Sequence, residues 1–278
     1  MGNAYEERLG TDRMLPLIFK MSLPAVAAQL VNLLYNIVDR IYIGHIPGIG
    51  TDALAGIGVT SAVIILISSF SAIVGAGGSP LAAIALGQGN RERAGQILGN
   101  GLILLLIFTI LTSATTYLFM EPILLFTGAS ENTIGYATDY LSIYLLGTLF
   151  VELSVGLNTF INTQGRPTIA MYSVLIGAIL NIGLDPLFIF TFGMGVKGAA
   201  LATILSQACS AIWVISFLTS KKASLRLEYR YMKLHKGIIL SILALGVSPF
   251  IMASTESLVG FVLNSSLEKF GDIYVSAL

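Results

Sequence analysis

Four acidic residues lie inside long apolar stretches of the sequence: Asp39, Glu152, Asp185 and Glu256. An ionised carboxylate in hydrocarbon is costly, so each of these side chains must face protein or water and find a partner. We therefore treat all four as candidates for binding a proton or a cation. The alternative is an acid at the headgroup level, or a buried neutral acid that pins two helices together.

A stripe of polar side chains leads up to the first of these acids. Its members are three, four and three residues apart: Gln29, Asn32, Asn36 and Asp39. This spacing puts them on one helical face, which predicts either an inward cavity or interhelical hydrogen bonds between the amides. Arg40 lies about 100° away around the helix. We expect it to extend outward rather than to neutralise Asp39.

A second cluster lies around Asp185. Asn181 is four residues earlier, on the same helical face, and Pro186 follows directly. Proline has no amide proton, so the carbonyl of Ile182 loses its helical donor. A carboxylate, an amide oxygen and a freed carbonyl are the acceptors that a proton or a hard cation such as Na+ requires. A proline kink without any chemistry is the alternative.

Two further sets of polar residues are candidate neighbours of these clusters. One set, at spacings of four and three, comprises Thr203, Gln207 and Ser210. It would add oxygen atoms to the acceptors around Asp185. The other set comprises Asn158, Asn162 and Gln164. These amides would either line the same cavity or cap the end of their helix, and the pattern does not separate the two roles.

The composition excludes several classes of protein. Hydrophobic residues make up 55% of the chain and charged residues 11%, whereas soluble domains carry roughly 25% charged residues. A net charge of +0 removes the basic field that nucleic-acid binding needs. One cysteine, Cys209, and two histidines provide neither a disulfide nor a zinc site. No phosphate loop, G-x-S-x-G elbow or H-E-x-x-H pair occurs, so no enzyme is predicted.

The elements that position the acids must be membrane-spanning helices. A bilayer core of roughly 30 Å needs about 20 mostly apolar residues. Seven stretches qualify: 14–43, 53–86, 95–120, 136–163, 168–192, 198–220 and 238–268. The predicted fold class is therefore all-α, a polytopic membrane helix bundle, with small residues allowing the helices to approach closely.

Charge distribution predicts the orientation and the domain organisation. Residues 1–13 are polar and do not resemble a cleavable signal peptide. A cytoplasmic N-terminus leaves only Arg40, Lys197 and Lys269 on the outer side, as the positive-inside rule requires. We expect a multi-pass protein of the cell membrane.

The polar segment 221–237 is predicted to be a cytoplasmic linker between an amino-terminal six-helix lobe, 1–220, and the first helix of a second lobe, 238–278. A weak internal repeat aligns Pro24 with Pro249, and transporters are commonly built from duplicated bundles. We therefore expect a truncated twelve-helix transporter.

Four segments together are specific for a known family. They are VDRIYIG at 38–44, LGQGN at 86–90, NIGLDPL at 181–187 and GAALAT at 198–203. With them the chain resembles the multidrug and toxic compound extrusion (MATE) family of antiporters. The resemblance implies two six-helix lobes around a central cavity, and export of cationic, amphipathic drugs in exchange for H+ or Na+. By resemblance, the positions of the cation site are Asp39, Asn181, Asp185 and Thr203.

The resemblance also assigns Glu256 to a position where some branches of the family carry an acid in the seventh helix. The residues expected to line the substrate cavity are Gln29, Asn32, Asn36, Glu152 and Glu256. No cofactor is expected, and no metal other than Na+ at Asp39 and Asp185. The expected partners are small cationic drugs, the lipid bilayer and a missing carboxy-terminal lobe, with no nucleic acid among them.

The functional hypothesis is secondary active efflux. Binding of H+ or Na+ at Asp39 and Asp185 would neutralise their charge, change how their helices pack, and alternate the cavity between the two sides of the membrane. One alternative is a flippase for lipid-linked oligosaccharides, which needs Arg and Lys in the cavity for the pyrophosphate. Another is a noncatalytic membrane scaffold.

Overall fold

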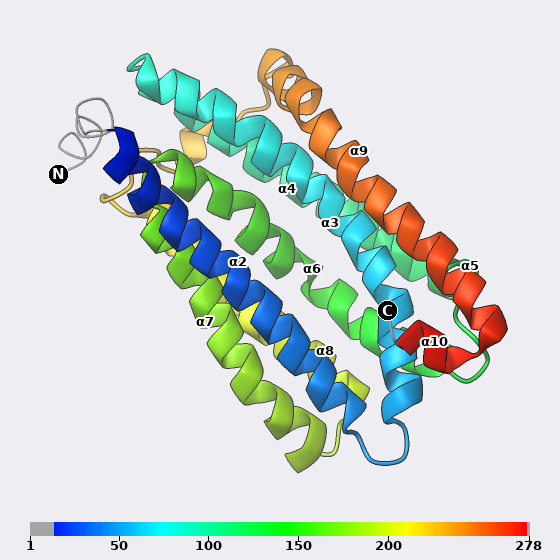
Figure 1. Cartoon of the computed structure of the whole chain (residues 1–278). Helices are drawn as coiled ribbons and strands as arrows, with labels where there is room; N and C mark the ends of the chain where they lie inside the picture. Colours follow the sequence, from blue (N-terminus) through cyan, green and yellow to red (C-terminus); the bar gives the residue numbers. More distant parts are fainter. Residues whose placement is uncertain (1–13, 277–278) are drawn as a thin grey trace.

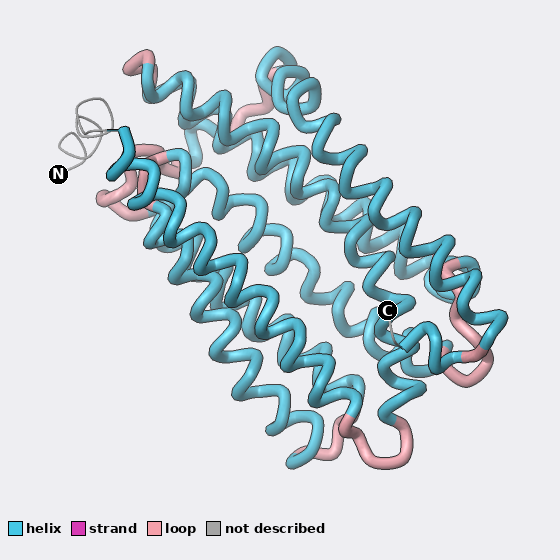
Figure 2. The backbone as a smooth tube through the Cα atoms, viewed as in Figure 1, coloured by secondary structure: helices cyan, strands magenta, loops and turns pink. Residues whose placement is uncertain are grey.

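The structure is a computed structural model that describes residues 14–276. Helices make up nearly all of this range, and short loops connect them (Figure 2). Across 14–276 there is no β-strand, so the predicted all-α class is confirmed. The prediction of a cytoplasmic N-terminus concerns residues 1–13, which lie outside the described residues.

Seven helices of the described chain are long and apolar enough to cross a membrane, and they match the seven predicted stretches. These are α2 (Met14–Gly44), α3 (Gly50–Gly87), α4 (Arg91–Leu118), α6 (Ile134–Thr163), α7 (Pro167–Pro186), which continues into the π-helix η1 (Leu187–Thr191), α8 (Val196–Thr219) and α9 (Lys236–Leu267). The short elements are α5 (Met120–Phe126), η2 (Tyr229–Tyr231), η3 (Glu268–Phe270) and α10 (Asp272–Ser276).

Turn and cap residues set the helix ends. Gly89 adopts φ +74° in the turn after α3, a conformation that residues with a Cβ rarely adopt. The side chain of Asn90 then caps α4 by accepting a hydrogen bond from the backbone N–H of Arg93 at 3.0 Å. Pro167 occupies the first turn of α7, where its missing N–H costs nothing.

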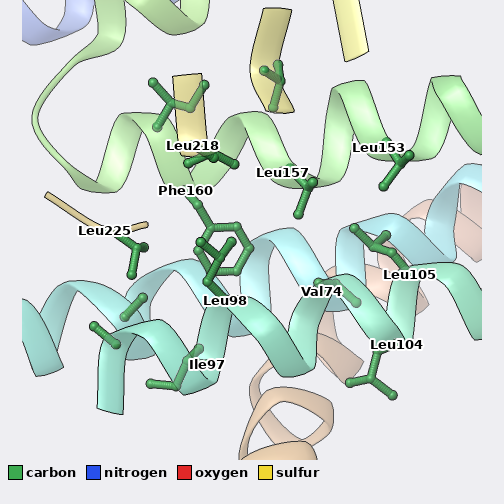
Figure 3. Packing of buried hydrophobic residues seen from close by; sticks show 14 of the residues in the cluster. Val74, Ile97, Leu98, Leu104, Leu105, Leu153, Leu157, Phe160, Leu218 and Leu225 are labelled. Carbon is green, nitrogen blue, oxygen red and sulfur yellow. The ribbon is translucent and has the colours of Figure 1, made fainter. Parts of the chain in front are cut away.

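The spanning helices form two groups with α6 between them (Figure 1). On one side α2 packs along α7, and α7 packs against α8. On the other side α3 packs against both α4 and α9. α6 contacts α3 and α8, so it connects the groups. Phe160 of α6 is fully buried in the core close to Leu98 of α4 and Val74 of α3 (Figure 3).

α9 lies directly against α3, because glycines remove the side chains at two points of contact. A Cβ on Gly77 would overlap the carbonyl oxygen of Ile242, and a Cβ on Gly246 would overlap that of Ile73. Small residues permit this approach between helix backbones in lipid. The proposed division into an amino-terminal lobe, a linker and a second-lobe helix stays a prediction.

The polar segment between α8 and α9 is packed onto the bundle by two buried amides. Gln164 accepts a hydrogen bond from the backbone N–H of Leu225 at 3.0 Å. Asn100 accepts one from the backbone N–H of His235 at 2.8 Å and donates to the carbonyl of Lys233 at 3.1 Å. The segment therefore has a fixed conformation along the ends of α4 and α6.

Candidate functional site

A cavity of about 470 Å³ lies between α2, α3, α6, α7 and α8. Its volume falls within the roughly 300–1,000 Å³ of small-molecule sites. The α2 wall consists of Asn32, Tyr35, Asn36, Asp39 and Arg40. Three members of the predicted polar stripe thus line an inward cavity, as their spacing indicates.

The cluster predicted around Asp185 lies behind the part of the cavity wall that Asp39 and Thr203 form. Asn181 is 2% exposed and Asp185 is fully buried. The amide Nδ2 of Asn181 donates to Asp185 Oδ1 at 3.2 Å and lies 3.4 Å from the hydroxyl oxygen of Thr203. The side chain of Asp39, on α2, interacts directly with the carboxyl of Asp185, on α7. The structure therefore brings together all four predicted cation-site residues.

Three oxygen atoms of this cluster are buried without a hydrogen-bond partner in the described structure: Asp39 Oδ1, Asn181 Oδ1 and Asp185 Oδ2. Buried acceptors without a donor are costly, and two neighbouring carboxylates repel each other when both are ionised. A proton on either carboxyl removes the repulsion and supplies a donor for one acceptor, and a hard cation among the oxygens reduces both penalties. The geometry therefore fits H+ or Na+.

Within residues 14–276, no group of three or more His, Cys, Asp or Glu side chains is arranged to hold a metal ion. A cation between Asp39 and Asp185 would consequently depend on neutral oxygens as well. The side-chain carbonyl oxygen of Asn181 and the hydroxyl of Thr203 are the neighbouring neutral oxygens. This mixed set suits a weakly held monovalent ion better than a permanently bound metal.

Local sequence explains how α7 and α8 meet at this point. Pro186 ends the α-helical part of α7, and the chain continues as the π-helix η1, a conformation that is frequent at functional sites. Gly195 then turns the chain with φ +55°. Gly198 packs against the backbone of Phe188, where a Cβ would lie 2.7 Å from its carbonyl carbon. α8 thereby returns beside α7 with Thr203 opposite Asn181.

Three tyrosines that the sequence analysis did not single out also line the cavity: Tyr35, Tyr140 and Tyr144. Tyr140 and Tyr144 of α6 are stacked, with ring centroids 6.1 Å apart and an interplanar angle of 17°. The sequence contained a sign of this pair, because the spacing of four residues between Tyr140 and Tyr144 puts both hydroxyls on one helical face. Aromatic faces close to an acid attract organic cations.

Comparison with known proteins identifies the family. The MatE family model matches residues 24–187, which is more than half of the chain. The chain belongs to the MatE family. It is a multi-pass membrane protein with an all-α fold.

The relatives of this MatE chain carry names of multidrug export or transport proteins. It is 27% identical over 256 residues to the multidrug export protein MepA of Staphylococcus haemolyticus (strain JCSC1435), covering 92% of this chain and 56% of MepA. It is 34% identical, with a TM-score of 0.92, to the MATE multidrug transporter DinF-BH, which was solved as a complex with a bound ligand, covering 98% of this chain and 60% of that one. An inward-facing multidrug resistance MATE family transporter gives a TM-score of 0.82 at 27% identity, covering 94% and 59%. The MatE chain thus spans little more than half the length of these relatives.

Two residues of the MatE chain that were expected in the cavity lie outside it. Gln29 is exposed and does not line the cavity. Ten residues separate it from Asp39, so it is displaced by about 80° around the helix. Glu256 is exposed on α9, whereas its neighbour Ser257 is buried and donates to the carbonyl of Ala62 on α3 at 2.6 Å. Since consecutive side chains diverge by about 100°, Glu256 points away from that contact.

Arg40 and Glu152 relate to the cavity in different ways. Arg40 contributes to the cavity wall beside Asp39 but is exposed. Its outward orientation stays a prediction. Glu152 is 3% exposed and sits behind the cavity wall, where Ser68 donates to its Oε1 at 3.0 Å. It is not itself part of the lining.

The remaining polar residues divide between two roles. Asn158 and Asn162 line the cavity of this MatE chain, as do Gln207 and Ser210 from α8. Gln164 is buried instead: its Nε2 donates to the carbonyl of Phe160 in the last turn of α6 at 3.1 Å, and its Oε1 accepts from the backbone N–H of Leu225. The two alternatives left open for the amides at the end of α6 thus both occur, at different residues.

Proposed function

We propose that this protein is a secondary active multidrug exporter that exchanges organic cations for H+ or Na+. Its relatives support the transport class, since MepA is named a multidrug export protein and DinF-BH a multidrug transporter. The observation that carries the proposal is the set of unpartnered buried oxygens on Asp39, Asn181 and Asp185.

Ion binding at this set would act through the contact between α2 and α7. When both carboxyls are ionised, their repulsion opposes the packing of the two helices. A bound proton or Na+ removes that repulsion and stabilises the packed arrangement. Since α2 has α7 as its main neighbour in the described structure, a change at Asp39 and Asp185 alters the principal contact that holds α2.

The same cavity suits a lipophilic cation. Asp39 supplies negative charge, and Tyr35, Tyr140 and Tyr144 supply aromatic faces. A cationic drug and the coupling ion therefore compete for one negative field. Exchange requires only that the two ligands favour different conformations, by about 1 to 3 kcal/mol.

The flippase alternative depends on basic residues in the cavity. Arg40 is the one Lys or Arg in the described lining, and a pyrophosphate carries more negative charge than one guanidinium offsets. A noncatalytic scaffold gains nothing from two neighbouring buried acids beside a cavity. Efflux is therefore the better-supported function.

We also propose that the amino-terminus and the segment 221–237 lie on the cytoplasmic side, on the positive-inside argument. Protease cleavage of a tag placed before Met1, with and without permeabilised membranes, tests this orientation. Cleavage in intact cells would contradict it.

Ethidium accumulation in cells expressing the protein tests the efflux proposal. Asp39→Asn and Asp185→Asn should each raise accumulation to the level of cells lacking the protein, because the neutral amide cannot exchange an ion. Glu256→Gln, an equivalent change at an exposed acid, should leave accumulation at the native level. Imposing a Na+ or a proton gradient separately identifies the coupling ion. Native-like, gradient-dependent efflux by both Asn variants would refute the proposal.

A further inference from the structure

Glu152 is a buried acid that the ion site described above does not use. Its side chain lies between α6 and α3, is 3% exposed, and accepts a hydrogen bond from the hydroxyl of Ser68 at 3.0 Å. Ser68 lines the cavity. Val151, Ser154 and Val155, which flank Glu152 on α6, line it too. The carboxyl is thus one hydroxyl group away from the cavity.

Among the described residues, the immediate surroundings of Glu152 provide no positive charge. α3 contributes the hydroxyls of Ser68 and Ser71, and the one charged residue of α3 is Asp52, in its first turn. The ionisable groups that line the cavity are Tyr140 and Tyr144, on α6 itself, and Tyr35, Asp39 and Arg40, on α2. Of these, Tyr144 interacts electrostatically with Glu152.

The other neighbouring helices carry their charges at their ends. The charged residues of α4 are in its first turn: Arg91, Glu92 and Arg93. The charged residue of α7 is Asp185, near its end, and the charged residue of α8 is Lys197, in its first turn. Within residues 14–276, neither Lys nor Arg pairs with Glu152. A buried carboxylate without a counter-charge is strongly disfavoured, whereas the neutral acid is not.

Glu152 is also separate from the Asp39–Asp185 pair. The pair joins α2 to α7, and Asn181 and Thr203 surround it. Glu152 joins α6 to α3 and shares no hydrogen-bond partner with that pair in the described part of the chain. Binding a proton at one site therefore does not require the other.

We propose that Glu152 and Ser68 form a second proton-binding site, which is open to the cavity through the Ser68 hydroxyl. In the uptake step, a hydronium ion in the cavity gives a proton to the Ser68 oxygen while the hydroxyl proton of Ser68 passes to Oε1. Water leaves, Ser68 remains neutral, and Glu152 becomes a carboxylic acid. The proton is thus bound behind the cavity wall and not in the space that a drug would occupy.

The test uses the purified full chain in detergent without any drug, so it does not depend on the efflux proposal. Infrared difference spectra between about pH 4 and about pH 10 report protonated carboxyls by their C=O stretch. Glu152→Gln should remove one carboxyl signal and reduce proton uptake by one per chain. Glu256→Gln should retain that signal, because it changes an exposed acid on α9. The double variant Asp39→Asn/Asp185→Asn should retain it too.

Ser68→Ala provides a second measurement that keeps the acid. It removes the hydrogen bond to Oε1, so the Glu152 signal should move to higher frequency and its proton exchange with the cavity should slow. An unchanged set of carboxyl signals in Glu152→Gln would overturn the proposal. A Glu152 signal that stays constant over the whole pH range would overturn it as well, since the acid would then be a permanently neutral packing group. If Glu152→Gln fails to fold, the pH response of the signal displaced in Ser68→Ala decides the question.

Discussion

Replacing Asp185 by Asn tests the ion site through stability rather than through transport. In the native protein Asp185 Oδ2, Asp39 Oδ1 and Asn181 Oδ1 are buried acceptors that lack a donor. In the native protein Asn181 Nδ2 donates to Asp185 Oδ1 at 3.2 Å. An asparagine at 185 keeps this acceptor oxygen and places an NH2 group at the position of Oδ2. The new NH2 group can donate to the neighbouring carboxyl of Asp39, and one of two repelling charges is removed.

The expected gain follows from satisfying one buried acceptor, which is worth about 1 to 3 kcal/mol. At alkaline pH without Na+, the Asn variant should therefore unfold at a Tm roughly 2 to 12 °C higher than the native protein. Lowering the pH supplies the native pair with a proton that replaces the missing donor. The difference should consequently shrink as the pH falls.

Thermal unfolding in detergent, with and without Na+, provides the measurement. A ligand that binds the folded state raises its stability by RT ln(1 + [L]/Kd), so the native protein should gain Tm with Na+ if Na+ is the ion. The Asn variant should gain none. Glu256→Gln, which alters an exposed acid, should behave like the native protein. A destabilised Asn variant, or one whose Tm still rises with the ion, would refute this account of the site.

Three further predictions concern packing, the fixed segment after α8, and the drug. Gly246→Ala should destabilise the protein by about 1 to 3 kcal/mol in equilibrium unfolding, because its Cβ overlaps the backbone of α3; Gly237→Ala, with nothing within 4 Å, should not. Asn100→Leu should lower the free energy of unfolding by about 1 to 3 kcal/mol, because it leaves buried backbone groups without hydrogen-bond partners. Trypsin should then cut segment 221–235 faster. An unchanged cleavage rate would show that other contacts hold the segment. Tyr140→Leu should weaken binding of ethidium, a fluorescent organic cation, by roughly two- to thirtyfold through loss of a cation–π contact, measured by fluorescence, whereas Tyr140→Phe should retain it; equal loss in both variants would assign the effect to the hydroxyl.

The spanning helices were predictable because the thickness of the bilayer sets their length, and because charges are excluded from their centres. The neighbourhood of Asn181 and Asp185 was predictable for a local reason, the spacing of four residues. Their proximity to Asp39 followed from the resemblance and not from periodicity. That these residues bind an ion stays a prediction.

Other features depended on tertiary packing and were not visible in any local pattern. Glu256 shares an apolar helix with Ser257, and only the contact with α3 decides which of the two faces inward. The segment after α8 is polar and reads as a linker, yet Asn100 and Gln164, far away in the sequence, fix its backbone. Gln29 fitted the stripe by spacing, but the helical period carries it off that face over three turns.

The glycine contacts of α3 and α9 have a mechanical consequence. At these two points the backbones of α3 and α9 are in direct contact, with no side chain between them that could change rotamer. We therefore expect the two helices to move together as a rigid pair. Gly246 contacts α3 at Ile73, five residues after Ser68. A displacement of α9 should therefore also displace the part of the cavity wall that contains Ser68.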